Sequence, residues 1–463
     1  MIFRTRRLLL TAPALALALA GLPWPLSAAV RPPKIPYELT KLPNGLTVIL
    51  SEDHSTPIVH LSVWYHVGSK DEPKGRTGFA HLFEHMMFKG SKNVEPEQHT
   101  STISSIGGQV NAYTTEDTTV FWQTVPAQYL PLVLWLEADR MATLRIDEAT
   151  FKSEREVVKE ERRMRIESQP YGRLQEIIYD QAFTVHPYKH PIIGSMADLE
   201  AASVADVRDF YETYYVPENA TLCLVGDFDA AQALELITRH FGPVPRAPRA
   251  VPRNIPREPP QTKERRLTIE EDWPLPAVVV AHHITYDGDP DAYPLHIASK
   301  ILSDGQSSRI YRKLVYEDRI ALAAFGQGHI IEHPNLFYAV AIVQPGRTPA
   351  EVAAALIAEL DRLRNEPISA RELQRAKNQF ARDYIIGRES VQEKALHLSH
   401  AVVLHNGDIT TADGEFDIFQ GVTAADVQRV ARTFFTPENR LVLTILPRGR
   451  GPGGVPGGQG GAQ

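Results

Sequence analysis

An internal repeat constrains the fold of this chain more than any other feature. Residues 203–219 contain Ser-Val-Ala-Asp-Val followed by Tyr-Tyr-Val-Pro-Glu-Asn, and residues 423–439 contain Thr-Ala-Ala-Asp-Val followed by Phe-Phe-Thr-Pro-Glu-Asn. Each copy predicts a Ser or Thr N-cap, a helix, a Pro-Glu-Asn turn and an apolar strand, in that order. The constant offset of 220 residues between the copies therefore predicts a duplicated fold.

A proline-rich segment separates the two copies. Between Pro243 and Pro260 the chain has seven prolines interleaved with four arginines. This composition cannot form a packed element and suits an extended linker. The expected parts are a signal peptide at 1–29, an N-terminal domain at 37–242, a linker at 243–263, a C-terminal domain at 264–447 and a Gly-rich disordered tail at 448–463.

The pattern of the first half indicates the fold class. Apolar periodicity and turn residues predict strands at 37–41, 46–50, 58–67, 110–115 and 118–125, and helices at 78–88, 127–144 and 147–168. Strands and helices mix without the strict alternation of a parallel sheet. We therefore expect two tandem homologous α+β domains.

One pentapeptide carries the chemistry. His81-Leu82-Phe83-Glu84-His85 is an H-x-x-E-H motif inside a predicted helix, which places His81 and His85 at i and i+4 on one face. Two neutral imidazoles can bind Zn²⁺ and leave positions for a water, whose pKa the metal lowers to roughly 7. Glu84 is the natural candidate for the base that takes the proton of that water.

A catalytic zinc usually has three protein ligands, so another segment must supply one. The best source is the predicted helix at 147–168, where Glu154 and Glu161 are two turns apart and share a face. One carboxylate can bind the metal while the other orients the water or tunes the ligands. The alternative is a solvated face of Glu-Arg pairs.

The surroundings of the motif identify a resemblance. The chain is similar to the inverted-motif zinc peptidases of the pitrilysin and mitochondrial processing peptidase family, particularly its short bacterial members, from about Tyr37 to about Pro447. The matching segments are Gly-Ser-Lys-Asp-Glu at 68–72, Phe-Lys-Gly-Ser at 88–91, Asn-Ala-Tyr-Thr at 111–114, Glu-Arg-Glu-Val-Val at 154–158 and His-Pro-Tyr at 186–188.

The resemblance implies roles for individual residues. It implies one Zn²⁺ per chain with His81, His85 and Glu161 as ligands, Glu84 as the base and Glu154 as an auxiliary catalytic residue. It also implies that Asn111 and Ala112 lie on an open strand edge, where an extended peptide adds as another strand. The two domains would form half of a clamshell-like peptidase chamber. At the offset of 220, the metal positions of the second copy hold Ile301, Gly305 and Ala381, so that copy is expected to be inactive.

The chain departs from the family in its second half. Self-sufficient members carry an Arg and, seven residues later, a Tyr that hold the substrate carbonyl in the transition state. The corresponding positions here are Val315 and Leu322, which donate no hydrogen bond. The resemblance therefore implies a homologous partner chain that lacks the metal motif and supplies Arg and Tyr, in a heterodimer, or else a homodimer.

The N-terminus predicts export. Three arginines precede the apolar run 8–22, and Ser27-Ala28-Ala29 supplies small residues for a signal peptidase. The bacterial periplasm is the expected destination, by the general secretory or the twin-arginine route. The apolar run is short and interrupted by prolines, so no stable membrane anchor is expected.

Composition excludes some functions. Without residues 1–29 the chain has 46 basic and 56 acidic residues, a formal charge of −10, which argues against nucleic-acid binding. Cys223 is the only cysteine, so neither an internal disulfide nor a cysteine zinc site is possible, and we expect it to be buried. His282, His283 and His329 show no ligand spacing and are expected to be structural or surface residues.

Two functions remain open. The leading hypothesis is an exported zinc metalloendopeptidase that cleaves peptides or unfolded segments. The alternative is a catalytically weak peptide-binding or assembly subunit of the same fold. The complete set of His81, Glu84, His85 and Glu161 favours the first, and the lack of the Arg and Tyr favours the second.

Overall fold

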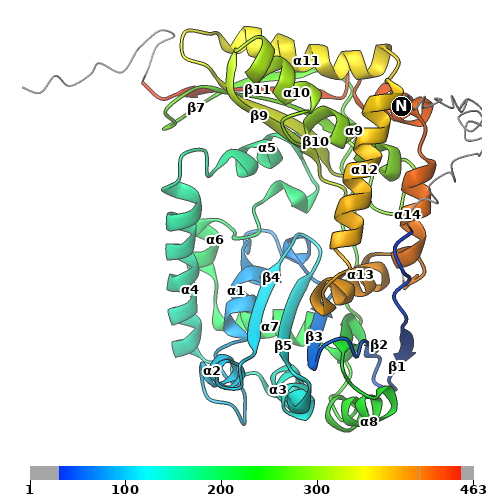
Figure 1. Ribbon diagram of the computed structural model, residues 1–463. Helices are drawn as coiled ribbons and strands as arrows, with labels where there is room; N and C mark the ends of the chain where they lie inside the picture. The colour runs from blue at the N-terminus through cyan, green and yellow to red at the C-terminus, as the bar shows by residue number, and fades with distance from the viewer. Residues whose placement is uncertain (1–30, 406, 450–463) are drawn as a thin grey trace, which may run out of the picture. The chain divides into compact units, whose positions relative to one another are not determined.

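The computed structural model describes residues 31–405 and 407–449 (Figure 1). The predicted signal peptide at 1–29 and all but two residues of the predicted tail at 448–463 lie outside this part. None of the helices in the described residues is both long enough and apolar enough to span a membrane.

In the first half, among the described residues, a mixed sheet has the strand order β1-β2-β6-β3-β5-β4. Its strands are β1 (Glu38–Lys41), β2 (Thr47–Glu52), β3 (Ile58–Tyr65), β4 (Gln109–Thr114), β5 (Thr119–Pro126) and β6 (Ala220–Gly226). Strands β2 and β6 are parallel, and all other neighbours are antiparallel. The predicted hairpin of the first two strands is confirmed, since Glu38 pairs with Leu50 and Lys41 with Thr47.

The second half repeats this topology in the order β7-β11-β8-β10-β9. Its strands are β7 (Arg265–Glu271), β8 (Ala277–His283), β9 (Ala321–Gly328), β10 (Leu336–Val343) and β11 (Arg440–Pro447). Here too one pair, β7 and β11, is parallel and the rest are antiparallel. Strand for strand, β7-β11-β8-β10-β9 matches β2-β6-β3-β5-β4, which confirms the predicted duplication.

The helices of the first half are α1 (Phe79–Met86), α2 (Gln98–Ser105), α3 (Leu130–Thr143), α4 (Glu148–Arg162), α5 (Leu174–Ala182), α6 (Met196–Ala201), α7 (Val204–Tyr214) and α8 (Ala230–Phe241). Those of the second half are α9 (Ala292–Ser303), α10 (Arg309–Tyr311), α11 (Pro349–Asn365), α12 (Ala370–Ile386), α13 (Val391–Leu404), α14 (Thr411–Gly421) and α15 (Ala424–Phe434). The helix predicted at 147–168 is α4 followed by a π-helical turn at 163–167.

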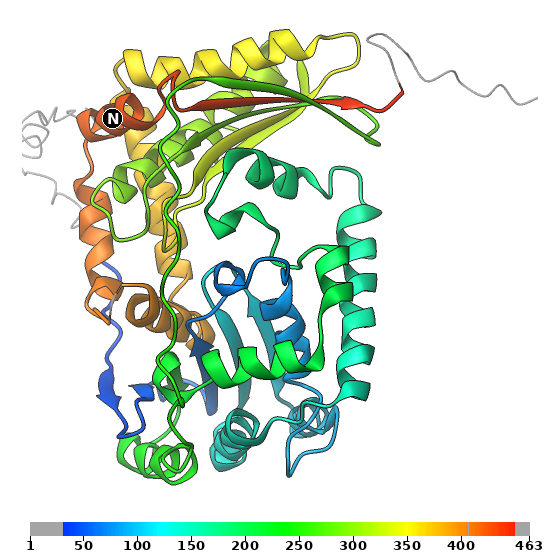
Figure 2. The same cartoon turned by 180° about the vertical axis from the view of Figure 1, so that it is seen from behind.

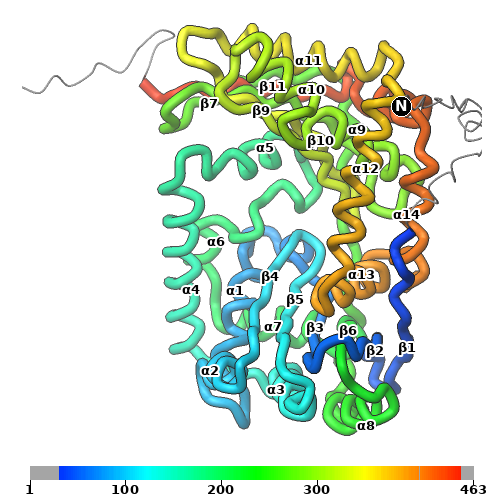
Figure 3. The backbone as a smooth tube through the Cα atoms, viewed as in Figure 1, coloured from blue at the N-terminus to red at the C-terminus, as the bar shows by residue number. Residues whose placement is uncertain are grey.

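The two halves exchange one helix each. Side chains of α5, including Ile178, pack in a core with the strands of the second sheet. In return, α13 lies against the first sheet (Figure 3). Ala395 and Leu398 of α13 share a core with Cys223 and Ile49 of that sheet. The residues of α5 and α13 correspond at the offset of 220, so the exchange is reciprocal. Each half therefore completes a core of the other, and Cys223 is buried as predicted.

The predicted linker at 243–263 has no helix or strand in the structure and joins α8 to β7 (Figure 2). Polar contacts hold it in place. Arg253 donates to the carbonyl of His66 at 2.7 Å, and Glu258 accepts from the backbone N–H of Val185 and of His186, both at 2.9 Å. The linker is thus extended and fixed along its course by hydrogen bonds.

Candidate active site

Helix α1 carries the metal motif, and a buried carboxylate fixes its start. The carboxylate of Glu72 accepts the backbone N–H groups of Gly78 and Ala80, both at 2.8 Å, which satisfies donors that a helix N-terminus leaves free. Gly78 has φ +92° and packs so close to the chain at Ile193 that an added Cβ would lie 2.6 Å from that carbonyl. Only glycine tolerates this turn into the helix.

Helix α4 supplies the carboxylates. It begins where Asp147 caps the backbone N–H of Thr150 at 2.9 Å, and it packs against α1. Glu154 and Glu161 both face α1, as their two-turn spacing predicts, with Glu154 almost fully buried and Glu161 half-buried. The alternative of a solvated Glu-Arg face is therefore wrong for these two positions.

The structure brings together the three predicted ligands. Glu161 Oε2 lies 3.3 Å from His85 Nε2 and 3.8 Å from His81 Nε2, and one donor atom from each residue lies within 4.8 Å of the others. Tetrahedral Zn²⁺ with bonds of about 2.0–2.1 Å separates its ligand atoms by about 3.3 Å. The spacing and the donor types of this set therefore fit zinc.

Glu154 lies on the other side of His85. Its Oε2 is 3.8 Å from His85 Nδ1, and its Oε1 is 3.2 Å from Nζ of Lys89. Burial opposes a charge on His85, but the carboxylates of Glu154 and Glu161 outweigh it and raise the pKa of His85 to about 9. Burial and the neighbouring His85 lower the pKa of His81 to about 4. The two carboxylates therefore favour a positive charge on His85, while His81 stays neutral.

Glu84 lies beside the ligands with one oxygen fixed. The hydroxyl of Thr114, on β4, donates to Glu84 Oε2 at 2.6 Å. Burial raises the pKa of the Glu84 carboxyl. Thr114 was not among the predicted site residues, although it follows Asn111 and Ala112, and Ala112 and Thr114 share a strand face because side chains alternate along a strand.

A cavity of about 390 Å³ opens in front of this group and is lined by His81, Glu84, Ala112, Glu161 and Arg165, among others. Within the part of the chain that the structure describes, strand β4 pairs with β5 alone and forms one edge of the first sheet. The backbone N–H of Ala112 donates to the Asn111 side chain at 2.9 Å rather than to another strand. Asn111 and Ala112 therefore lie at an open edge next to Glu84. There the backbone N–H of Ala112 is bound by the Asn111 side chain, which a substrate could displace.

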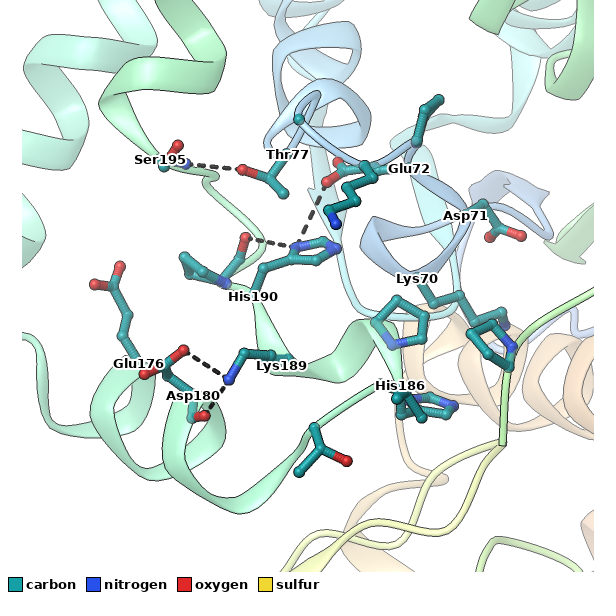
Figure 4. A pocket seen from close by; sticks show the side chains of 18 of the residues that line it. Lys70, Asp71, Glu72, Thr77, Glu176, Asp180, His186, Lys189, His190 and Ser195 are labelled. Atoms are coloured by element: carbon teal, nitrogen blue, oxygen red, sulfur yellow. Dashed lines mark hydrogen bonds and ion pairs between the residues drawn. The ribbon is translucent and has the colours of Figure 1, made fainter. Parts of the chain in front are cut away.

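A larger cavity, of about 1070 Å³, lies behind the start of α1 (Figure 4). Lys70, Glu72, His186 and Lys189 line it, and Figure 4 shows their side chains around it. None of the three ligands lines it. It meets the active-site cavity at Glu176, His190 and Pro191, which line both.

The second half has no metal ligands at the equivalent place within the described residues. Ile301 is buried in the core, Gly305 follows α9, and Ala381 lies on α12. Next to them, Lys300 of α9 pairs with Asp383 of α12, Nζ to Oδ2, at 2.8 Å. These residues give the second half no counterpart of the three candidate ligands of the first half.

The two positions where the family has the Arg and the Tyr hold apolar residues here, and these residues differ in burial. Val315 packs against the core of the second half, and Leu322 on β9 is 50 % exposed. Arg309, which lies nearby in the sequence, is buried and paired with Glu372, its Nε 2.8 Å from Oε1. It is therefore held in place by that ion pair.

The other histidines singled out from the sequence are structural. His283 contacts the carbonyl of Ala182 at 3.2 Å, and His329 Nδ1 contacts the hydroxyl of Tyr179 at 2.5 Å. Both contacts join the second sheet to α5. His282 is buried in the second half beside Phe435.

The comparisons with known proteins agree with this arrangement. Residues 47–196 match the model of "Insulinase (Peptidase family M16)", and residues 201–380 match that of "Peptidase M16 inactive domain". The zinc protease PqqE of Helicobacter pylori is 29% identical over 414 residues, which cover 89% of this chain and 93% of that protein. The probable mitochondrial-processing peptidase subunit beta of Arabidopsis thaliana is 23% identical over 421 residues, covering 88% and 78%.

Solved structures show the same fold. The crystal structure of a protease from Helicobacter pylori superposes with a TM-score of 0.85 at 29% identity and covers 89% of this chain and all of that one. The first half of the periplasmic protease PqqL from Escherichia coli gives a TM-score of 0.73 at 20% identity, while this chain covers only 48% of the longer PqqL structure. From its two domains and its relatives, this chain belongs to peptidase family M16.

Proposed function

We propose that this protein is an exported zinc metalloendopeptidase that cleaves peptides or unfolded protein segments. The observation that carries the proposal is the convergence of His81, His85 and Glu161, with Glu84 beside them and fixed by Thr114. Zinc bound there would act as a Lewis acid and lower the pKa of a water to roughly 7. The zinc proteases among the relatives support the same activity.

In this proposal each residue has a defined task. His81, His85 and Glu161 hold the metal, while Glu154 orients His85 through its second ring nitrogen. Glu84 takes a proton from the attacking water at its free oxygen and passes it to the leaving amine. Thr114 keeps the other oxygen of Glu84 in place.

The open edge of β4 would bind the substrate. An extended peptide would displace the side chain of Asn111 from the N–H of Ala112 and pair with the strand. Main-chain hydrogen bonds do not depend on side chains, so we expect broad specificity for flexible peptides.

A homologous partner chain completes the proposal. Val315 and Leu322 cannot donate to the developing oxyanion, and each missing donor costs about 10²–10³ in turnover. The match of this chain to about half of PqqL supports a chamber built from two such units. The partner would lack the metal motif and supply the Arg and Tyr in a heterodimer; the alternative assembly is a homodimer.

The alternative function is a peptide-binding or assembly subunit with little turnover. Val315 and Leu322 favour it, because neither residue can donate a hydrogen bond to the developing oxyanion. Hydrolysis of a quenched peptide by the purified chain, alone and with candidate partners, separates the two functions. Glu84→Gln should keep zinc and lose activity by about 10²–10⁴, since it removes only the base. Full activity in Glu84→Gln would end the peptidase proposal.

Two further tests concern the partner and the export. Val315→Arg combined with Leu322→Tyr should recover part of the rate in the lone chain, and a lone chain as fast as any mixture would contradict the need for a partner. N-terminal sequencing of the mature protein should show cleavage after Ala29. A cytoplasmic protein that starts at Met1 would contradict export.

A further inference from the structure

A second group of metal-binding side chains lies in the other half of the molecule. Asp287 comes from the segment between β8 and α9, His400 from α13, and His405 from the residue that follows α13. One donor atom from each lies within 4.8 Å of the others. In the described residues, this group and the set of His81, His85 and Glu161 are the two that meet this spacing.

The donor atoms match those of the active site in type and spacing. Asp287 Oδ2 lies 2.9 Å from His405 Nε2 and 3.5 Å from His400 Nε2. These distances bracket the separation of about 3.3 Å between ligands of tetrahedral zinc. Two imidazoles and one carboxylate suit Zn²⁺ and its first-row neighbours better than Mg²⁺ or Ca²⁺, which prefer oxygen ligands.

Both ring nitrogens of His405 lie within hydrogen-bond distance of an oxygen atom. The hydroxyl of Thr411 donates to the carbonyl of Asp408 at 2.8 Å, so its oxygen is free to accept from His405 Nδ1 at 2.9 Å. With the proton on Nδ1, neutral His405 turns the lone pair of Nε2 toward the carboxylate of Asp287. Without a metal, a proton on Nε2 bridges the ring and Asp287 Oδ2 at 2.9 Å, and a cation that replaces this proton would meet the Nε2 lone pair and the carboxylate oxygen together.

Another carboxyl group lies near Asp287, and one side of the three-residue group is open to solvent. Burial and the nearby carboxylate of Asp287 raise the pKa of the Glu415 carboxyl on α14 to about 7. Asp287 and His405 are nearly buried, at 14% and 7% side-chain exposure, whereas His400 is 42% exposed. A cation can therefore reach the group from the side of His400 and be held by two buried ligands.

We propose that Asp287, His400 and His405 form a second zinc site, separate from the peptidase site and structural in role. The site joins α13, which covers the first sheet, to the segment that follows β8 of the second sheet. Bound zinc would therefore fasten the exchanged helix to its own half. The proposal is independent of the peptidase function.

Zinc content measured on the untagged full chain tests the proposal. The wild type should hold about two zinc ions per chain, and His81→Ala/His85→Ala should hold about one. Adding His400→Gln and Asp287→Asn to that variant should remove the remaining ion. His240→Ala, which removes a histidine of α8 outside both groups, is the matched control and should leave the content of the wild type unchanged.

Cobalt absorption and the melting temperature test the second site without an activity assay and show whether each variant is folded. In the His81→Ala/His85→Ala protein, Co²⁺ should give the visible absorption of a tetrahedral site, and zinc should raise the melting temperature by a few degrees. His400→Gln alone should abolish both effects, and its melting temperature in chelator should equal that of its parent. An imidazolium–carboxylate pair without metal predicts no zinc, no cobalt spectrum and no thermal shift in the His81→Ala/His85→Ala protein, and that result would overturn the proposal.

Discussion

The helix pairs α1/α4 and α9/α12 occupy equivalent places in the two halves of the molecule. They differ in a few side chains, which shows that the same helix pair can hold either a candidate metal site or an ion pair. In each pair the first helix packs against an edge strand, α1 against β4 and α9 against β9, and the second helix packs against the first. Between α1 and α4, two imidazoles face Glu161, whereas between α9 and α12 the ammonium of Lys300 faces Asp383 at 2.8 Å. The lysine supplies its own positive charge there, so this pair needs no metal ion.

The largest effect is expected from removing one carboxylate from each helix pair, Glu161 of α4 or Asp383 of α12. Glu161→Ala should lose the catalytic zinc and lower turnover by roughly a thousandfold or more, because it removes a ligand. Asp383→Ala is the matched change and should leave turnover within about twofold, since it breaks only a partly exposed ion pair. Peptide hydrolysis and zinc analysis of the two variants measure these effects. Equal losses of turnover in the two variants would contradict the claim that only the first half holds the catalytic metal.

The contact between the halves should respond to pH. Glu332, near the start of β10, pairs with His66 at 2.7 Å and with Lys70 of the first half. Burial opposes its charge, but His66 and Lys70 outweigh burial and lower the pKa of Glu332 to about 2. Glu332→Gln should lower the free energy of unfolding by about 2–4 kcal/mol at pH 7.

The sign follows from the lowered pKa. The stabilisation is complete above the unfolded pKa of Glu, about 4.5, and is lost as pH falls through about 2. Denaturant unfolding of wild type and Glu332→Gln should therefore differ less at pH 3 than at pH 7. A difference that does not change with pH would contradict the pairing.

A smaller effect is expected at Thr114. Thr114→Val removes the hydroxyl that donates to Glu84 at 2.6 Å and keeps the shape of the side chain. We expect kcat to fall by about tenfold to a hundredfold with zinc content unchanged. Thr114→Ser should restore most of the rate. Loss of zinc in Thr114→Val would show that the hydroxyl supports the ligands rather than the base.

The smallest effect is expected at Arg165. Its guanidinium lies 2.6 Å from Glu161 Oε1, the oxygen that faces away from the histidines, but its side chain is 76% exposed. Solvent weakens such a pair, so Arg165→Ala should weaken zinc binding by about two- to fivefold. Competition with a zinc chelator measures this, and a hundredfold change would show that Arg165 holds the ligand in place.

Local patterns predicted the duplicated halves and the side chains that converge between α1 and α4, because both depend on spacing along the chain. The i, i+4 histidines and the two-turn glutamates lie on helices, and helix geometry converts spacing into a shared face. The resemblance then identified Glu161 as the third ligand, and the structure brings it within 3.3 Å of His85. That His81, His85 and Glu161 bind zinc stays a prediction, as do the roles of Glu84, Glu154, Asn111 and Ala112.

Features that depend on long-range packing were not predicted. Helix α2 was missed because Gln98–Ser105 has one strongly apolar residue, Ile103, and so shows little periodicity. The helix exchange of α5 and α13 leaves no local signal, because the sequence of a helix does not show which sheet its buried face covers. The site at Asp287, His400 and His405 was missed because its carboxylate lies far from the histidines in sequence and their i, i+5 spacing is not a helical ligand pattern.

Zinc anomalous diffraction from crystals of the mature chain tests the central claim most directly. It locates the metal without reference to activity or to a partner. The account predicts a strong peak bounded by His81, His85 and Glu161, and no peak between Lys300 and Asp383. A zinc-loaded crystal without the first peak, or with a peak between α9 and α12, would contradict it.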